Sequence, residues 1–139
     1  MNLNKEAILA QLNAIVPNTL LETLKISYTD VGDDFLTAKM PVNPSVHQPQ
    51  GLLHGGATVA LAETVGSTAS HLFIDTKKYK VKGLEISANH LKSKRDGEVF
   101  ATARFIHKGR TTHLWEIRVE DEEGNLISLC KLTTIVLEK

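Results

Sequence analysis

The sequence predicts an α+β fold in which an antiparallel sheet wraps around one long helix. One segment, residues 57–73, has sustained helical periodicity, short runs of alternating polar and apolar residues lie on both sides of it, and turn-forming residues separate the later runs. A sheet folded over a single helix buries the apolar side of both. The chain has 139 residues, so we expect 1–139 to form a single domain.

Residues before the long helix predict a short helix followed by a hairpin. Apolar side chains recur at helical spacing up to Ile15, and Pro17 ends that segment. Alternation then indicates a strand, and the Gly-Asp-Asp stretch after Val31 supplies turn chemistry. We expect a helix at 4–15, a strand at 24–28, a turn at 31–34, a returning strand at 35–42 and a loop at 43–51.

The long helix has two different sides. One side is predicted to pack on the sheet and carries Leu61, Val65, Thr68 and Leu72. The other side is almost free of bulk and carries Gly56, Ala60, Glu63, Ser67 and Ser70. A solvated helix face usually carries long charged side chains, so this second side favours close approach by a ligand or another chain.

Four strands are predicted after the helix, at 84–89, 99–105, 113–119 and 126–137. The turns between them have hairpin character, so we expect an antiparallel meander in which Leu84, Ile86 and Ala88 share one face. The last strand is apolar on both faces and is therefore predicted to be central. An edge strand left unpaired would favour dimerisation by sheet extension.

Composition excludes several classes of protein. The formal net charge is zero, which gives no overall attraction for nucleic acid or acidic lipid. The single cysteine, Cys130, lies in an apolar run and is interpreted as a buried small hydrophobe. No signal-peptide core and no stretch of about 18 apolar residues is present, so a cytoplasmic protein without a membrane partner is expected.

The chemistry is predicted at the start of the long helix. Gly55 and Gly56 allow close approach of a ligand, and the first N–H groups of a helix can bind an anion or a developing oxyanion. Glu63 lies about two turns further along, roughly 10 Å from the glycines. An acyl carbonyl held at the glycines could meet a carboxylate from an antiparallel copy of the helix, so we expect an active site shared across a dimer.

Each of these features also has a structural interpretation. A glutamate within a helix is usually a solvated charge, a Gly-Gly pair is usually a turn, and a single histidine such as His54 is usually structural. Their combination at this spacing, next to a helix side without bulk, favours a function.

The segment HQPQGLLHGGATVALAETVGS, residues 47–67, resembles the signature of the hotdog-fold acyl-CoA thioesterases of the phenylacetate-pathway type. The branch it resembles contains the 1,4-dihydroxy-2-naphthoyl-CoA hydrolases and the enterobactin-proofreading thioesterases. The likeness continues through GDDFLTAKMPV, VKGLEISANH and CKLTTIVLEK, and so covers nearly the whole chain.

This resemblance implies roles for individual residues. Glu63 would be the nucleophile or general base, and the Gly55 N–H would polarise the thioester carbonyl. His54 and Gln48 would orient the substrate and the leaving group, and Ser67 would help to place the water or the carboxylate. The implied CoA contacts are Gly83, His90, Lys92, Ser93, His107, Lys108, Gly109 and Arg110, with Lys94 as a further cation for the phosphates.

The resemblance also implies dimers that assemble into tetramers. Two departures bear on the substrate: Lys92 stands where relatives often carry arginine, and Gln50 replaces an aromatic residue found in aryl-CoA relatives. Aryl, phenylacetyl-like and medium-chain acyl groups stay open, as does an acyl carrier protein as the delivering partner. The six histidines lack metal-ligand spacing, so no metal and no cofactor are expected, CoA being part of the substrate.

Two alternatives stay open at this point. A dehydratase or hydratase of acyl thioesters would use an acid and a base at the acyl chain, and His54 with Glu63 could be read as that pair. A sensor that binds acyl-CoA without turnover would keep the same fold, but such sensors usually carry a separate DNA-binding domain, and the short neutral helix expected ahead of the sheet counts against this alternative.

Overall fold

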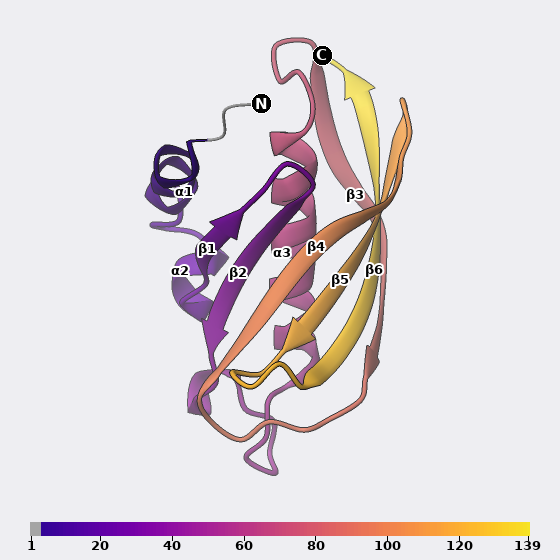
Figure 1. The fold of residues 1–139 in the computed structure, drawn as a ribbon. Coiled ribbons are helices and arrows are strands. Elements are labelled where there is room, and N and C mark those ends of the chain that lie inside the picture. The colour runs from indigo at the N-terminus through magenta and orange to yellow at the C-terminus, as the bar shows by residue number, and fades with distance from the viewer. Residues whose placement is uncertain (1–3) are drawn as a thin grey trace.

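Six strands form one antiparallel sheet that wraps around a long helix in the computed structural model, which describes residues 4–139 (Figure 1). The predicted α+β arrangement is therefore confirmed. The elements are α1 (Lys5–Ala14), α2 (Leu20–Leu24), β1 (Ser27–Val31), β2 (Phe35–Pro41), a 3₁₀ turn (Pro44–Val46), α3 (Gly55–Leu72), β3 (Tyr79–His90), β4 (Glu98–Lys108), β5 (Thr112–Glu120) and β6 (Leu126–Glu138).

The strand order is β1-β2-β4-β5-β6-β3, and every neighbouring pair is antiparallel. The predicted meander holds for β4, β5 and β6 but is wrong for β3, which pairs with β6 instead of β4. The reason is that α3 carries the chain across the inner face of the sheet to its far side. Residues 91–97 then return below the sheet to β4 (Figure 1). The last strand is paired on both sides, as predicted.

The core lies between α3 and the sheet. Leu61 and Val65 of α3 have no exposed surface and belong to one buried cluster with Trp115 and Leu132 of the strands. Gly66 sets the closeness of this contact, because a Cβ atom there would lie 2.6 Å from Cδ2 of Leu132. The packed side of α3 is thereby held against the sheet, and its opposite side is left for the candidate site.

Two residues of α3 lie on the side opposite to the one predicted. Ser70 was expected on the open side but is fully buried, where its hydroxyl accepts a hydrogen bond from Trp115 Nε1 at 2.6 Å and contacts His113 Nδ1 at 3.0 Å. Thr68 was expected on the packed side but is half-buried at the edge, with its hydroxyl 2.8 Å from that of Tyr28. A short hydroxyl side chain is easily buried once it is hydrogen-bonded, which explains Ser70, whereas Thr68 lines the open groove although helical periodicity had placed it on the packed side.

The predicted N-terminal helix is confirmed as α1, whereas the strand expected at 24–28 begins later. Leu24 ends the short helix α2, which the Thr19 hydroxyl caps by accepting a hydrogen bond from Leu21 N–H. Lys25 then adopts a left-handed conformation with φ 59°, and β1 starts at Ser27. The expected loop at 43–51 contains only the single 3₁₀ turn.

The inward alternation predicted for the strand at 84–89 fails at its first residue. The pairing of β3 with β6 shifts register between Gly83 and Glu85, so Leu84 is 58% exposed while Ile86 and Ala88 pack against the core. Because β3 is also the last strand in the sheet order, one side of its backbone is unpaired within residues 4–139, next to the exposed Leu84 side chain. Cys130 is buried, as predicted, and burial raises the pKa of its thiol.

Candidate active site

The first two residues of α3 are glycines at the positive end of the helix dipole. His54 caps the helix, because its Nδ1 accepts a hydrogen bond from Gly56 N–H at 2.8 Å. In the neutral ring the proton is therefore on Nε2. Among residues 4–139 the Gly55 N–H donates to no acceptor, which leaves it available for a carbonyl oxygen or an anion.

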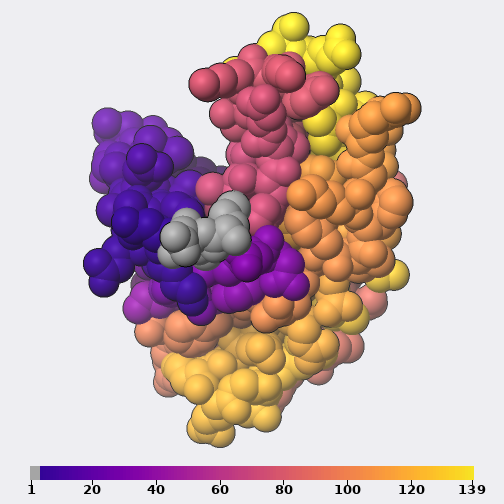
Figure 2. Space-filling view, turned by 45° about the horizontal axis from the view of Figure 1, so that its top comes forward, coloured from indigo at the N-terminus to yellow at the C-terminus, as the bar shows by residue number. Residues whose placement is uncertain are grey.

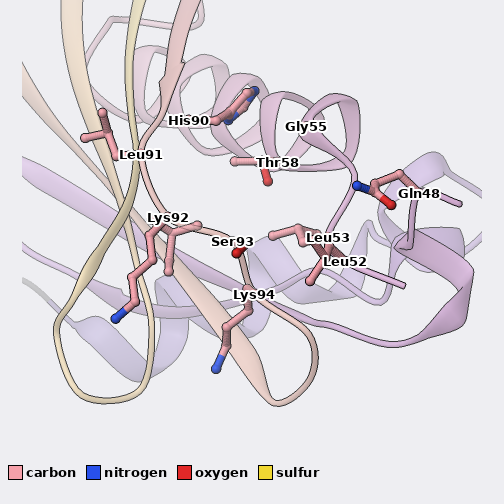
Figure 3. A pocket seen from close by; sticks show the side chains of 11 residues that line it. Gln48, Leu52, Leu53, Gly55, Thr58, His90, Leu91, Lys92, Ser93 and Lys94 are labelled. Atoms are coloured by element: carbon pink, nitrogen blue, oxygen red, sulfur yellow. The ribbon is translucent and has the colours of Figure 1, made fainter. Parts of the chain in front are cut away.

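A cavity of about 320 Å³ lies beside this N–H group (Figure 3). Its lining includes the predicted site residues Gln48, Gly55, His90, Lys92 and Ser93, and also Lys94, the further cation. The His90 ring points toward the start of α3, and a Cβ atom at Gly55 would lie only 2.7 Å from its Nε2. Glycine is thus the residue that allows the ring to sit against the helix backbone.

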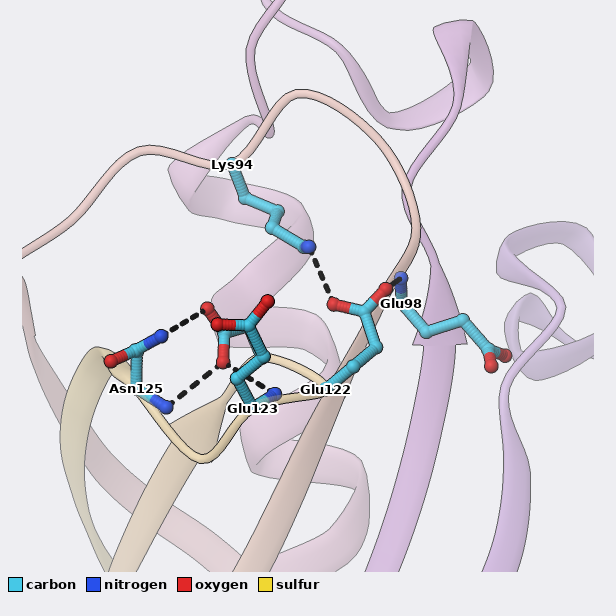
Figure 4. Close-up of polar contacts among 6 residues, drawn as sticks. Lys94, Glu98, Glu122, Glu123 and Asn125 are labelled. Carbon is cyan, nitrogen blue, oxygen red and sulfur yellow. Dashed lines mark hydrogen bonds and ion pairs between the residues drawn. The ribbon is translucent and has the colours of Figure 1, made fainter.

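The same cavity is framed by two polar contacts. The Gln48 side-chain oxygen accepts a hydrogen bond from Gln50 N–H, which holds the loop before α3 in shape. Lys94 Nζ lies 2.6 Å from Glu122 Oε1, and the other Glu122 oxygen accepts from Glu98 N–H at 2.9 Å (Figure 4).

This ion pair changes the expected role of Lys94. Its ammonium lowers the pKa of Glu122 to about 2, and the hydrogen bond to Glu122 raises the pKa of Lys94. Lys94 was counted among the cations for CoA phosphates, but its charge is taken up by a carboxylate of the β5–β6 turn. Lys92 of the same loop forms no ion pair within the part of the chain that the structure describes.

A second hollow of about 540 Å³ separates the N-terminal helices from α3 (Figure 2). Glu63 and Ser67 line it from α3, and Ile15 and Leu20 contribute apolar surface from the opposite side. Tyr28 also lines it, and burial raises the pKa of its phenol, which therefore stays protonated at neutral pH. The result is an apolar groove with hydroxyl groups and one carboxylate along its helix wall.

The Glu63 carboxylate is exposed and has no hydrogen-bond or ion-pair partner among residues 4–139. Gly83 of β3 lies directly beside it: a Cβ atom there would be 3.1 Å from Glu63 Oε2 and 3.8 Å from Ser67 Oγ. The resemblance assigned Gly83 to CoA, so its contact with the carboxylate was not anticipated. A glycine within a strand is itself a signal of close approach by a neighbouring group.

The remaining predicted CoA residues lie near the other end of α3. Lys108, Gly109 and Arg110 line a hollow of about 200 Å³ together with Phe73, which follows the last turn of the helix. Lys108 Nζ lies 5.7 Å from the centre of the Phe73 ring, in a cation–π contact. His107 is next to this group, because a Cβ atom at Gly109 would be 2.7 Å from its Nε2.

Within one chain the predicted site residues therefore form three separate groups along α3. By helical rise, Gly55 and Glu63 are about 12 Å apart along the axis, and the whole helix is about 27 Å long. The cavity beside Gly55 and the groove beside Glu63 share no lining residue. One chain alone does not bring the free N–H and the carboxylate to the same substrate atom.

Two polar residues in or next to these cavities were not predicted as site residues from the sequence. Thr68 forms a hydroxyl pair with Tyr28 at the groove wall, and the buried Ser128 of β6 contacts His90. The only sequence signal for Ser128 is a hydroxyl within an apolar run.

Among residues 4–139, no three histidine, cysteine, aspartate or glutamate side chains gather closely enough to hold a metal ion. None of the helices in that range has the length and apolar character needed to cross a membrane.

Comparison with known proteins assigns the family. The profile of the thioesterase superfamily matches residues 50–128. The 1,4-dihydroxy-2-naphthoyl-CoA hydrolase of Escherichia coli is 42% identical over 96% of this chain and 97% of its own length, and the proofreading thioesterase EntH of Cronobacter turicensis is 46% identical over 93% of each. A crystal structure of a mutant of thioesterase PA1618 from Pseudomonas aeruginosa superposes with a TM-score of 0.92 at 48% identity, covering 94% of both chains. The chain therefore belongs to the thioesterase superfamily and is a hotdog-fold thioesterase.

Proposed function

We propose that the protein hydrolyses acyl-CoA thioesters at active sites shared between two copies of the chain. Glu63 of one copy would face the free Gly55 N–H of the other. The observation that carries this proposal is the separation of the two groups: they lie about 12 Å apart along one helix and line different cavities.

The edge strand β3 supports such a pairing of copies. One side of its backbone pairs with no strand among residues 4–139, and Leu84 in the strand and Leu91 just after it are 58% and 61% exposed. Two copies joined antiparallel at β3 would continue the sheet and set their α3 helices side by side in opposite directions. Each Glu63 would then approach the other copy's glycines, and assembly of two such dimers would give a tetramer.

The proposed reaction starts when the thioester oxygen accepts a hydrogen bond from Gly55 N–H. Glu63 then takes a proton from water as the water oxygen bonds to the carbonyl carbon, and the negative charge moves to the oxygen at the helix N-terminus. One such donor contributes roughly 3–4 kcal/mol to lowering the barrier. Collapse of the intermediate breaks the C–S bond with both electrons going to sulfur, and the proton on Glu63 passes to the thiolate.

A nucleophilic role for Glu63 is the second form of the same proposal. Its carboxylate would attack the carbonyl directly, CoA thiolate would leave, and water would hydrolyse the resulting anhydride. Ser67, one turn further along α3, is suited in both forms to hydrogen-bond the water or the carboxylate. Neither form needs a cofactor, since CoA is part of the substrate.

The groove beside Glu63 is the proposed site of the acyl group. Ile15 and Leu20 give it an apolar wall, and the Tyr28–Thr68 hydroxyl pair adds a polar group to the helix side. This mixture fits an aryl or hydroxyaryl acyl group, and one of the relatives is named as a dihydroxynaphthoyl-CoA hydrolase. The groove has a volume of about 540 Å³, which is in the range of small-molecule sites.

CoA would extend from the cavity beside Gly55 across to the other copy. Lys92 and Ser93 lie at one end of α3, and Lys108 and Arg110 at the other, so antiparallel helices would bring the two sets toward one nucleotide. An acyl carrier protein presents the same phosphopantetheine arm, so its thioesters are the second substrate to be tested.

A hydrolysis screen tests the reaction. Benzoyl, hydroxynaphthoyl and aliphatic CoA thioesters, and one carrier-protein thioester, are assayed for free thiol with the wild type and Glu63→Gln. We expect release from aryl substrates that falls by about 10³-fold or more in the variant. Alkene formation without thiol release would instead identify a dehydratase, and full activity of Glu63→Gln would refute the role of this carboxylate.

A mixing experiment tests the shared site. Glu63→Ala and Gly55→Pro are each expected to be inactive, since one lacks the carboxylate and the other the N–H. A mixed dimer of the two has one site with both changes and one site with neither. Random reassociation of equal amounts should therefore restore about a quarter of wild-type activity, and well-mixed heterodimers without any activity would exclude sharing.

A further inference from the structure

A buried serine on β6 contacts the histidine that faces the start of α3. Ser128 has no exposed surface, and its hydroxyl oxygen lies 3.0 Å from His90 Nδ1 and 3.1 Å from the backbone oxygen of Asn89. The thiol of Cys130 is 3.6 Å away. The mechanism proposed above does not use this serine.

Counting hydrogens decides how the contact is made. A serine hydroxyl has one hydrogen, so both contacts are hydrogen bonds at once only if the hydroxyl donates to the carbonyl oxygen of Asn89, which can only accept. The 3.0 Å contact with His90 is then a hydrogen bond only if the ring donates from Nδ1. In the neutral ring this leaves Nε2 without a proton and with its lone pair free.

That bare nitrogen lies at the candidate site. Nε2 is the His90 atom closest to Gly55, 2.7 Å from the position of a Cβ atom there, and His90 lines the same cavity as the free Gly55 N–H. The cavity therefore has a backbone donor and an imidazole acceptor on one wall. His54, which also borders the start of α3, has the opposite tautomer because its Nδ1 accepts from Gly56.

We infer that Ser128 is a positioning residue, which holds His90 as the Nδ1–H tautomer so that Nε2 accepts a hydrogen bond from an amide N–H of the pantetheine arm of CoA. The inference rests on the proposed function, since it assumes an acyl-CoA in this cavity. It also excludes neutral His90 as the acid that protonates the leaving thiolate, because its cavity-facing nitrogen has no proton to give. That proton is left to Glu63.

Nitrogen NMR of the histidine rings tests the tautomer directly. At about pH 8, where an ordinary histidine is neutral, wild-type His90 should show a protonated Nδ1 and an unprotonated Nε2. In Ser128→Ala the partner of Nδ1 is lost, and the ring should shift to the Nε2–H form. A wild-type ring with Nε2 protonated, or a tautomer that does not respond to the substitution, overturns the inference.

Kinetics test the role of the tautomer. Ser128→Ala would put an N–H where an acceptor is needed, so KM for the acyl-CoA should rise roughly tenfold, with kcat changed by less than about threefold. Ser70→Ala is the matched control: its hydroxyl is equally buried and also contacts a histidine Nδ1 at 3.0 Å, but near the other end of α3. An unchanged KM in Ser128→Ala, or an equal rise in the control, overturns the inference.

A pair of His90 variants keeps the test valid if Ser128→Ala does not fold. His90→Gln can present an amide oxygen near the Nε2 position and should raise KM clearly less than His90→Leu, which should raise it roughly tenfold. Equal KM values in the two variants contradict an acceptor role. In the His90→Gln background, Ser128→Ala should add no further change, because there is no tautomer left to select.

The outcomes separate this inference from the proposed function. If the wild type hydrolyses acyl-CoA and KM is unchanged in Ser128→Ala, only the inference fails. If no acyl-CoA is hydrolysed, the proposed function fails, and calorimetric affinity for CoA itself then takes the place of KM. CoA binding that is weakened roughly tenfold by Ser128→Ala would still support the acceptor at His90.

Discussion

Substitution of Gly83 by alanine should displace the Glu63 carboxylate without lowering the stability of the fold. The added Cβ would lie 3.1 Å from Glu63 Oε2, closer than ordinary van der Waals contact, so the carboxylate must move by a few tenths of an ångström. Glu63 is exposed and its side chain is flexible, so this movement costs little in folding free energy. Alanine also removes some of the conformational freedom that glycine has in the unfolded chain, worth about 0.5–1 kcal/mol.

The catalytic cost should be larger. A displacement of 1 Å at a reacting group can lower the rate by about 10²-fold, so a shift of a few tenths should lower kcat by roughly tenfold, equivalent to about 1.4 kcal/mol of barrier. We expect kcat to fall by this factor while KM and the midpoint of thermal unfolding stay close to the wild type. Steady-state kinetics with an aryl-CoA and a thermal melt measure the three quantities.

The split between kcat and KM decides between two roles for Gly83. The resemblance assigned it to CoA binding, which predicts a raised KM with kcat preserved. Its position beside Glu63 predicts the reverse. An unchanged kcat would refute the reasoning that Glu63 acts from its place next to Gly83, and Ser87→Ala, an exposed site on the same strand, serves as the control for changes at this sheet edge.

Two further predictions concern charged groups outside the catalytic residues. Burial, with a smaller effect of the Lys108 charge, lowers the pKa of His113 below its ordinary 6.5. The unfolded chain therefore binds more protons below that pH, and the free energy of unfolding should fall as pH drops. Urea unfolding between about pH 7 and about pH 5 should show this slope, and an equal slope in His113→Gln would contradict it. Glu122→Gln removes the ion-pair partner of Lys94, and this ion pair anchors the loop that carries Lys92. We therefore expect faster hydrogen exchange in that loop and a raised KM for acyl-CoA, with little change in global stability. Unchanged exchange would show that the exposed pair does not hold the loop.

Much of the fold could be predicted because it depends on local patterns. Periodicity and turn residues located the helix at Gly55–Leu72 and the strands β4, β5 and β6 to within a few residues. The errors have local causes too: the Thr19 cap made a short helix where alternation indicated a strand, and a register shift after Gly83 turned Leu84 outward. The strand order could not be predicted from local patterns, because β3 pairs with β6, and the strands β4 and β5 lie between them in the sequence.

The sequence by itself determined that two glycines start a long helix and that a glutamate follows two turns later, and its resemblance to the hotdog thioesterases predicted the family. Only the tertiary structure decided what surrounds them: Gly83 beside Glu63, His90 against Gly55, Lys94 paired with Glu122, and Ser128 in contact with His90. These contacts join residues far apart in the chain, and a hydrogen bond or a close approach depends on distances of tenths of an ångström. Periodicity along the sequence assigns a residue to a face of its own helix or strand, but only the packing of those elements determines which side chain from another segment meets it.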